Sequence, residues 1–245
     1  MVESQNSEAL IIRRNDWRES DSRVVLYTKN FGKLSLVARG AKKMRSKIAG
    51  HIEPISLVDA MILKGKAFDY LGSAITKQAY LNIKSDLNAL YFVGAAFSLF
   101  DTQVKEAAPD EELHRFLISW LETVEKRTET ELNKEEGELL YDYFVLRLMT
   151  LLGYKPELYY CVACQQKIEP GDNFFNLRLG GLIDPKCLTE NKLKYLPNEL
   201  FKISNDAIKV LRLLTESDIF PNIKIETELL RELGRIAKLM VDFSS

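Results

Sequence analysis

The sequence predicts an α+β protein of several domains, in which a small β-barrel precedes a bundle of helices that is interrupted by a short insertion. Three observations support this fold class. Residues 8–78 hold five short runs rich in β-branched and aromatic residues, and a helical period begins near Ser85. All three cysteines lie between Cys161 and Cys187, in a stretch with no helical period. The expected domains are residues 1–80 for the barrel, 81–158 with 191–245 for the helices, and 159–190 for the insertion.

The barrel is expected from five strands. "EALIIRRN" is the first, and "SRVVLYTKNFGKLSLVARGA" gives two more around a turn in which Gly32 takes a positive φ. After a basic linker, "ISLVDAMIL" and "AFDYLGSAITKQAY" flank a second turn at residues 64–66. Five strands are too few for an immunoglobulin-like sandwich, and no crossover helices separate them. We therefore expect a closed or nearly closed barrel, because closure removes exposed strand edges.

Capping and stop signals delimit the helices. Asp110 is expected to cap "EELHRFLISWLETVEKR", and "GELLYDYFVLRLMTLLG" ends at Gly153. The second of these segments is apolar on nearly every side, which predicts a position at the centre of the bundle. Ser204 and Thr227 are expected to cap two further helices, whose apolar stripes return them to the same bundle.

Charge is distributed unevenly, although the 245 residues carry a net charge of only -1. Residues 1–80 contain 14 Lys and Arg against 8 Asp and Glu, whereas residues 81–158 contain 8 against 15. No run approaches the roughly 20 apolar residues of a membrane span, and the first residues lack a signal-peptide pattern. A cytoplasmic location is expected, where cysteines more often bind metal or remain free thiols than form disulfides.

The linker "RGAKKMRSKIAGH" concentrates positive charge between two predicted strands. Lys and Arg neutralise phosphates and release condensed counterions, so this loop is a candidate for binding a nucleic-acid backbone. The alternative is a solvated loop. Trp17 and Phe31, both next to turns, are the aromatic residues selected for stacking on bases, against the alternative that they belong to the core. The candidate phosphate-binding residues are Arg39, Lys42, Lys43, Arg45 and Lys47, flanked by Arg14 and Arg18.

The cysteines have the spacing of a metal site built from two knuckles. Cys161 and Cys164 are separated by two residues, and Asp184 and Cys187 repeat that spacing after 19 intervening residues. One interpretation is a structural Zn²⁺ held by three thiolates and the Asp184 carboxylate. The other is a small domain with three reduced thiols, held by its own packing. A thioredoxin-like redox role is disfavoured, because the pair does not open a helix in a strand-helix-strand unit.

No catalytic constellation emerges from the sequence. The two histidines, His51 and His114, fall in different predicted domains. The chain has no Gly-x-Ser-x-Gly elbow, no His-Glu-x-x-His motif and no phosphate-binding Gly-x4-Gly-Lys-Ser/Thr loop. We expect a protein that is not an enzyme.

Three stretches resemble the bacterial RecO family of recombination mediators. "RESDSRVVLYTKNFGKLSLVARGAKK" is similar to its N-terminal signature, "LLGYKPELYYCVAC" resembles the segment that leads into its Cys-x2-Cys, and "GGLIDPKC" parallels the end of its zinc site. The resemblance covers essentially the whole chain. Asp184 stands where members that keep zinc have cysteine, and some members have lost the metal, so the departure concerns the metal and not the function.

This resemblance implies an oligonucleotide-binding (OB) barrel, a helical domain and a zinc-finger-like insertion. It further implies DNA repair by a nucleoid-associated protein without ATPase activity, which binds single- and double-stranded DNA, anneals complementary strands and helps RecR load RecA onto strands coated by single-strand DNA-binding protein (SSB). The acidic, Phe-ending SSB tail would dock on the helical domain, with Arg115 or Arg147 as the rim cation. Two alternatives stay open: an adaptor that binds the SSB tail with little direct DNA binding, and an RNA-binding barrel protein.

Overall fold

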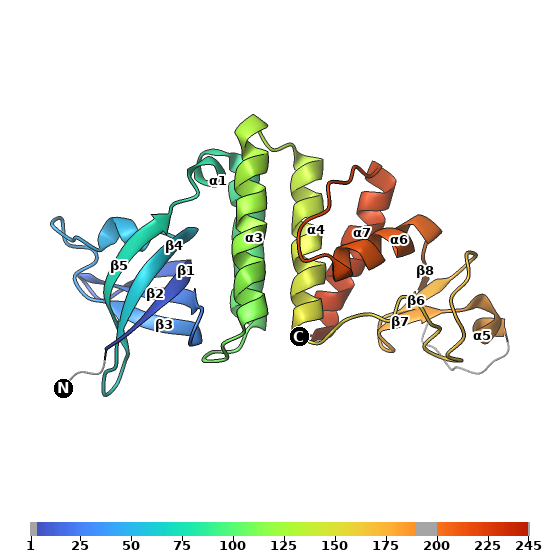
Figure 1. The fold of residues 1–245 in the computed structure, drawn as a ribbon, viewed down its shortest axis with the longest axis horizontal. Helices are drawn as coiled ribbons and strands as arrows, with labels where there is room; N and C mark the ends of the chain where they lie inside the picture. Colours follow the sequence, from blue (N-terminus) through green and yellow to red (C-terminus); the bar gives the residue numbers. More distant parts are fainter. Residues whose placement is uncertain (1–3, 190–199, 245) are drawn as a thin grey trace. The chain divides into compact units, whose positions relative to one another are not determined.

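The computed structural model describes residues 4–189 and 200–244 and divides into two compact units, Met1–Leu132 and Asn133–Ser245 (Figure 1). The first unit holds the barrel and three helices. The second holds further helices and a small three-stranded sheet. The helical segments are thus shared between the units. Within the described ranges, no helix combines the length and the apolar character needed to cross a membrane.

Five strands form a closed barrel in the order β1-β2-β3-β5-β4, as the sequence predicts. All neighbouring pairs are antiparallel except β3 and β5, which pair in parallel. A short 3-10 helix lies between β3 and β4, and it forms the end of the basic linker. The elements are β1 (Ser4–Trp17), β2 (Asp21–Thr28), β3 (Gly32–Ala38), the 3-10 helix η1 (Ala49–His51), β4 (Ser56–Leu63) and β5 (Tyr70–Gln78).

The long first strand makes closure possible because it pairs on both sides. Ser4 to Ile11 pair with β4, and Ala9 to Trp17 pair with β2. The register with β2 shifts between Ile11 and Arg13, and such a bulge bends a strand and increases its twist. Inward-facing aliphatic residues from every strand fill the interior, including Ala9, Ile11, Val24, Leu26, Leu36, Val58, Ile62 and Leu71.

The β2–β3 turn shows why a glycine is required there. Gly32 has φ +67°, and a Cβ at this position would lie 2.4 Å from the backbone carbonyl carbon of Ala108. Lys33 is buried beside this turn, and its ammonium donates to the Asp101 carbonyl at 2.5 Å. Arg13 also donates to the Asp101 carboxylate, at 2.8 Å. The barrel is therefore held against the helical residues that follow it.

The helices of the first unit are α1 (Leu81–Ser85), α2 (Leu87–Gln103) and α3 (Glu111–Arg127), followed by the 3-10 helix η2 (Thr128–Thr130). The Asp86 carboxylate caps α2 by accepting from the Ala89 N–H. The predicted cap of α3 is confirmed, since the Asp110 carboxylate accepts from the Leu113 N–H at 2.9 Å.

In the second unit, α4 (Lys134–Leu151) packs against both α6 (Asn205–Glu216) and α7 (Thr227–Ser244) and is buried on most sides, as its composition predicts. Ser204 caps α6, again as predicted. The prediction for Thr227 is wrong. The Leu230 N–H donates to the Glu226 carbonyl, so the first helical turn includes Thr227.

A buried carboxylate lies at the crossing of α4 and α7. Asp142 is 7% exposed, and a Cβ at Gly234 would lie 3.1 Å from its Oδ2 atom. Burial, followed by the nearby Glu138 charge, raises the pKa of Asp142 to about 7. Glycine at position 234 therefore leaves space for a carboxylate that is costly to ionise.

The insertion contains β6 (Phe174–Asn176), β7 (Gly181–Ile183) and the short helix α5 (Pro185–Thr189). Strand β8 (Leu200–Lys202) completes the sheet, in the order β7-β6-β8. The sequence indicates β6 and β7 but not β8, which lies beyond residue 190. Three residues are too few for a recognisable period, and the pairing with β6 joins distant parts of the chain.

Candidate nucleic-acid interface and metal centre

The basic linker leaves β3 as a loop whose stem is fixed to the barrel. Gly40 donates its N–H to the Asp21 carboxylate at 2.8 Å, and Lys42 donates its N–H to the Ser20 carbonyl at 3.0 Å. Ala41 and Ile52 are buried in the barrel core at the two ends. The loop therefore starts and ends at defined places next to the β1–β2 turn.

The tip of the loop is a hydrogen-bonded turn that projects cations into solvent. Ser46 donates its N–H to the Lys43 carbonyl at 2.9 Å. Lys43, Arg45 and Lys47 are exposed. No ion pair involves any of these three side chains within the described part of the chain. They are available to contact phosphates.

Two of the predicted cations are already paired with acidic residues. Lys42 lies 3.0 Å from the Asp16 carboxylate and also donates to the Arg18 carbonyl. Arg14 contacts the Glu53 carboxylate at 2.5 Å and the Ala49 carbonyl at 3.2 Å. Because both acids are largely exposed, such pairs are weak and a phosphate group could compete for the cations. These contacts place Arg14 and Arg18 beside the loop.

Aromatic rings and further cations meet next to this loop. The rings of Trp17 and Phe68 lie edge to face with centroids 6.0 Å apart, and the Arg23 guanidinium lies 5.3 Å from the Trp17 ring centroid. The Arg39 guanidinium lies 4.0 Å from the Tyr70 ring centroid. We call these five residues the aromatic patch. Strand ends far apart in sequence bring them together.

The two aromatic residues selected from the sequence have different positions. Trp17 belongs to the aromatic patch. Phe31 is partly buried and packs against the barrel core, so the prediction that it stacks on bases is not supported by its position. Phe68, which is 41% exposed, and Tyr70 were not selected. Their role depends on the pairing of β3 with β5, and local sequence carries no signal for that pairing.

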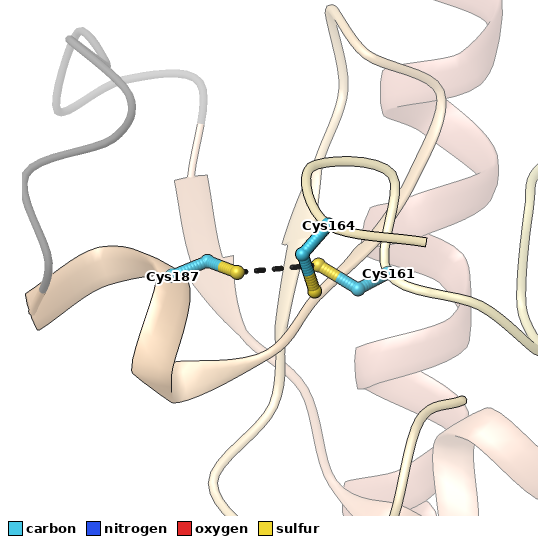
Figure 2. A group of neighbouring side chains, drawn as sticks. All are labelled: Cys161, Cys164 and Cys187. Atoms are coloured by element: carbon cyan, nitrogen blue, oxygen red, sulfur yellow. Dashed lines mark hydrogen bonds between the residues drawn. The ribbon is translucent and has the colours of Figure 1, made fainter. Parts of the chain in front are cut away.

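The three cysteines converge in the insertion. The sulfurs of Cys161, Cys164 and Cys187 all lie within 4.8 Å of one another. Figure 2 shows the three sulfurs pointing toward one another, with Cys187 carried by α5. The sulfurs of Cys161 and Cys187 lie 3.8 Å apart. This cluster can bind a metal ion, and thiolate donors favour soft cations such as Zn²⁺.

The surroundings of the sulfurs affect their ionisation differently. Burial opposes ionisation of Cys161. The backbone N–H groups of Asp184, Cys164 and Ala163 donate to its sulfur, and together they lower the pKa of Cys161 overall. Burial, together with the two neighbouring sulfurs, raises the pKa of Cys187 to about 12. A cation between the sulfurs would displace the remaining protons, because the thiolate is the form that binds metal.

Asp184 does not join the cluster, so the four-ligand prediction needs correction. Its Oδ1 atom accepts from the Lys186 N–H at 2.7 Å, and its carbonyl accepts from the Cys187 N–H at 3.0 Å. The carboxylate thus accepts a backbone N–H of the first turn of α5 and acts as the cap of that helix. It is not among the ligand atoms that converge. Among the residues that the structure describes, the converging donor set is three sulfurs, one fewer than a closed tetrahedral zinc site contains.

The two arginines predicted to bind a partner differ in exposure. Arg147 is buried, donates to the Thr215 carbonyl at 2.8 Å and pairs with Asp218, so it joins α4 to the end of α6. This contradicts its predicted role as a rim cation, because its guanidinium is committed to contacts inside the unit. Arg115 is exposed on α3.

A different apolar pocket, of about 220 Å³, lies in the second unit. It is formed by the segment after α4, the insertion and α7. Tyr154, Leu179 and Phe243 contribute exposed apolar surface, and Lys155 also lines the pocket. Sequence analysis missed this site because its walls come from three separate segments.

Comparison with known proteins gives matches over nearly the whole chain. Residues 1–80 match the family described as recombination protein O N terminal, and residues 84–244 match recombination protein O C terminal. The DNA repair protein RecO of Dehalococcoides mccartyi (strain ATCC BAA-2266 / KCTC 15142 / 195) is 34% identical over 242 residues, covering 97% of this chain and 89% of the relative. RecO of strain CBDB1 is 30% identical with the same coverage, and RecO of Roseiflexus sp. (strain RS-1) is 31% identical, covering 91% and 76%.

Proposed function

Because the chain belongs to the RecO family of DNA repair proteins, we propose that it is a non-enzymatic recombination mediator. It binds single- and double-stranded DNA, anneals complementary strands and helps RecR load RecA onto SSB-coated DNA, in the cytoplasm and at the nucleoid. The observation that carries the proposal is the basic loop, which presents unpaired cations at its tip beside the aromatic patch.

DNA phosphates contact Lys43, Arg45 and Lys47 first, because these cations have no acidic partner to displace. Arg14 and Lys42 join by exchanging Glu53 and Asp16 for phosphates. Bases of a single strand stack on Phe68, the exposed ring of the aromatic patch, a contact worth about 1–3 kcal/mol per base. Such binding tolerates any sequence and weakens steeply with salt.

The cysteine cluster holds one structural Zn²⁺ through Cys161, Cys164 and Cys187, with the fourth ligand supplied from outside these residues. The ion would contribute stability to the insertion by neutralising three thiolates in a partly buried place. The chain order supports this role, since β7 is followed by Asp184 and then by α5, which carries Cys187. The DNA-binding residues of the barrel take no part in it.

The apolar pocket beside Lys155 is the candidate site for the SSB tail. A terminal phenylalanine needs an apolar slot, and its carboxylate needs a cation at the rim. Leu179 and Phe243 supply the first, and Lys155, which lies 3.6 Å from Glu216, supplies the second. Leu179→Asp should weaken binding of a fluorescent Phe-ending acidic peptide by about tenfold or more. Arg115→Ala tests the other candidate cation. If Arg115→Ala weakens peptide binding and Leu179→Asp does not, the SSB tail binds at α3 and not at the pocket.

Strand annealing tests the proposed function directly. Complementary oligonucleotides, bare or coated with SSB, should anneal faster with the protein and without ATP. Failure to bind DNA at low salt, with capture of the SSB tail retained, would favour the adaptor function instead. Comparing RNA and DNA oligomers of equal length distinguishes the RNA-binding alternative.

A further inference from the structure

An apolar side chain occupies the tip of the basic loop. Met44 is 100% exposed, more than any other large hydrophobic residue in the described ranges. Single exposed apolar residues are common on protein surfaces, so exposure alone carries no function. The position of Met44 is distinctive because the exposed cations Lys43 and Arg45 flank it directly.

The backbone holds Met44 in a defined place. It is the second residue of the turn that the Ser46 N–H closes on the Lys43 carbonyl, and the Lys43 N–H closes the preceding turn on the Gly40 carbonyl at 3.1 Å. Gly40 takes φ +65°, which glycine adopts without strain. Further along, Ile48 packs against the barrel core. Because these contacts fix the loop at its stem and along its length, little order has to be created when the tip binds.

The chemistry of the flanking residues selects the ligand. Cations on both sides of Met44 attract phosphates, which brings a nucleic-acid backbone to the tip and places the exposed Met44 side chain beside the bound strand. Apolar side chains, methionine among them, insert between base steps and unstack them in proteins that deform DNA. The thioether is flexible and polarizable, which suits a stacked and irregular surface.

We propose that Met44 is a wedge that inserts between adjacent bases while Lys43 and Arg45 hold the neighbouring phosphates. The inference rests on the proposed DNA binding and adds a mechanism to it. An inserted side chain separates adjacent bases and breaks the local stack of the bound strand. Its preferred substrates are single strands and sites next to mismatches or junctions, where unstacking costs least.

The test uses oligonucleotides with 2-aminopurine, whose fluorescence rises when the base is unstacked. Wild-type protein at saturation should raise the signal, and Met44→Ala should reduce that rise by about fivefold while its affinity stays within about threefold and its salt slope is unchanged. Met44→Leu should retain most of the rise. Ile75→Ala, which removes another exposed apolar side chain of the barrel, should behave as wild type. Thermal melting should be the same for all four proteins, because neither side chain is buried.

The outcomes separate the wedge from the proposed function. An undiminished 2-aminopurine signal with Met44→Ala would overturn the wedge and leave DNA binding intact, and the same signal with weakened RecR capture would assign Met44 to a protein contact. A changed salt slope would show that Met44→Ala disturbs the cations, which also contradicts a separate wedge. If wild-type protein does not bind DNA at low salt, the proposed function itself fails.

Discussion

Replacing the three unpaired cations of the loop tip is the sharpest test of the electrostatic mechanism. The variant changes Lys43, Arg45 and Lys47 to alanine. All three side chains are exposed and face no acidic partner in the described residues, so their removal costs little folding stability. The expected effect is confined to binding.

The magnitude follows from counterion release. Each phosphate contact contributes about 0.7 to the slope of log affinity against log salt on single strands, so three lost contacts reduce the slope by about 2. Between about 50 and about 200 mM salt, the ratio of wild-type to variant affinity should therefore shrink by roughly 20-fold. Glu53→Gln should raise the affinity while leaving the slope nearly unchanged, because Arg14 then contacts its phosphate without first giving up a carboxylate.

Fluorescence anisotropy with a labelled single strand, titrated across this salt range, measures the affinity and the salt slope of each protein. The matched control changes Lys167, Lys209 and Lys224 to alanine, which removes the same charge from the second unit and leaves the barrel unchanged. Equal slopes for wild type and the loop variant would refute the mechanism. Equal losses in the loop variant and the control would show that net charge, and not the loop, governs binding.

Three further predictions concern the second unit. Asp142→Asn should be more stable than wild type at high pH. Because its pKa is raised to about 7, Asp142 binds a proton more tightly in the folded state, so the wild-type protein loses stability as the pH rises from about 4 through about 7. In urea unfolding, the advantage of the variant should grow by about 2.5 kcal/mol from about pH 5 to about pH 8. A constant difference between the two proteins would contradict this. Arg147→Ala should lower the free energy of unfolding by about 2–3 kcal/mol, because it leaves the Thr215 carbonyl without its charged donor, whereas Arg115→Ala should leave it unchanged. Metal analysis of protein purified without chelator should find about one zinc per chain, lost in Cys187→Ser and retained in Asp184→Ala; loss in both variants would return Asp184 to the ligand set.

Local signals in the sequence were sufficient for most elements of the fold. The turn glycine Gly32 and the caps Asp110 and Ser204 act within a few residues of themselves, and the structure confirms all three. Strand β8 and the β3–β5 pairing were not predicted individually, because each depends on a partner far away in the chain. Periodicity identifies an element but does not identify its neighbour.

The same distinction separates the correct from the incorrect site residues. The cysteine spacing identified three sulfurs that do converge: Cys161 and Cys164 are brought together by their local turn, and α5 brings Cys187 to them. Asp184 has the same spacing but serves as a helix cap, and Arg147 has its partner 68 residues away at Thr215. Spacing records where a side chain sits along the chain, and not which backbone group it satisfies.

The close approach of Gly32 to Ala108 bears on how this protein can be divided or engineered. Residues 1–80 match a family of their own, which invites their use as a transplantable DNA-binding module. Cutting the chain after residue 80 would remove Ala108, which packs against Gly32 of the hairpin. It would also remove the Asp101 carbonyl, which accepts a hydrogen bond from the buried Lys33 ammonium. A fragment that extends to Leu132 retains both of these residues, and it is therefore the better unit for transplantation.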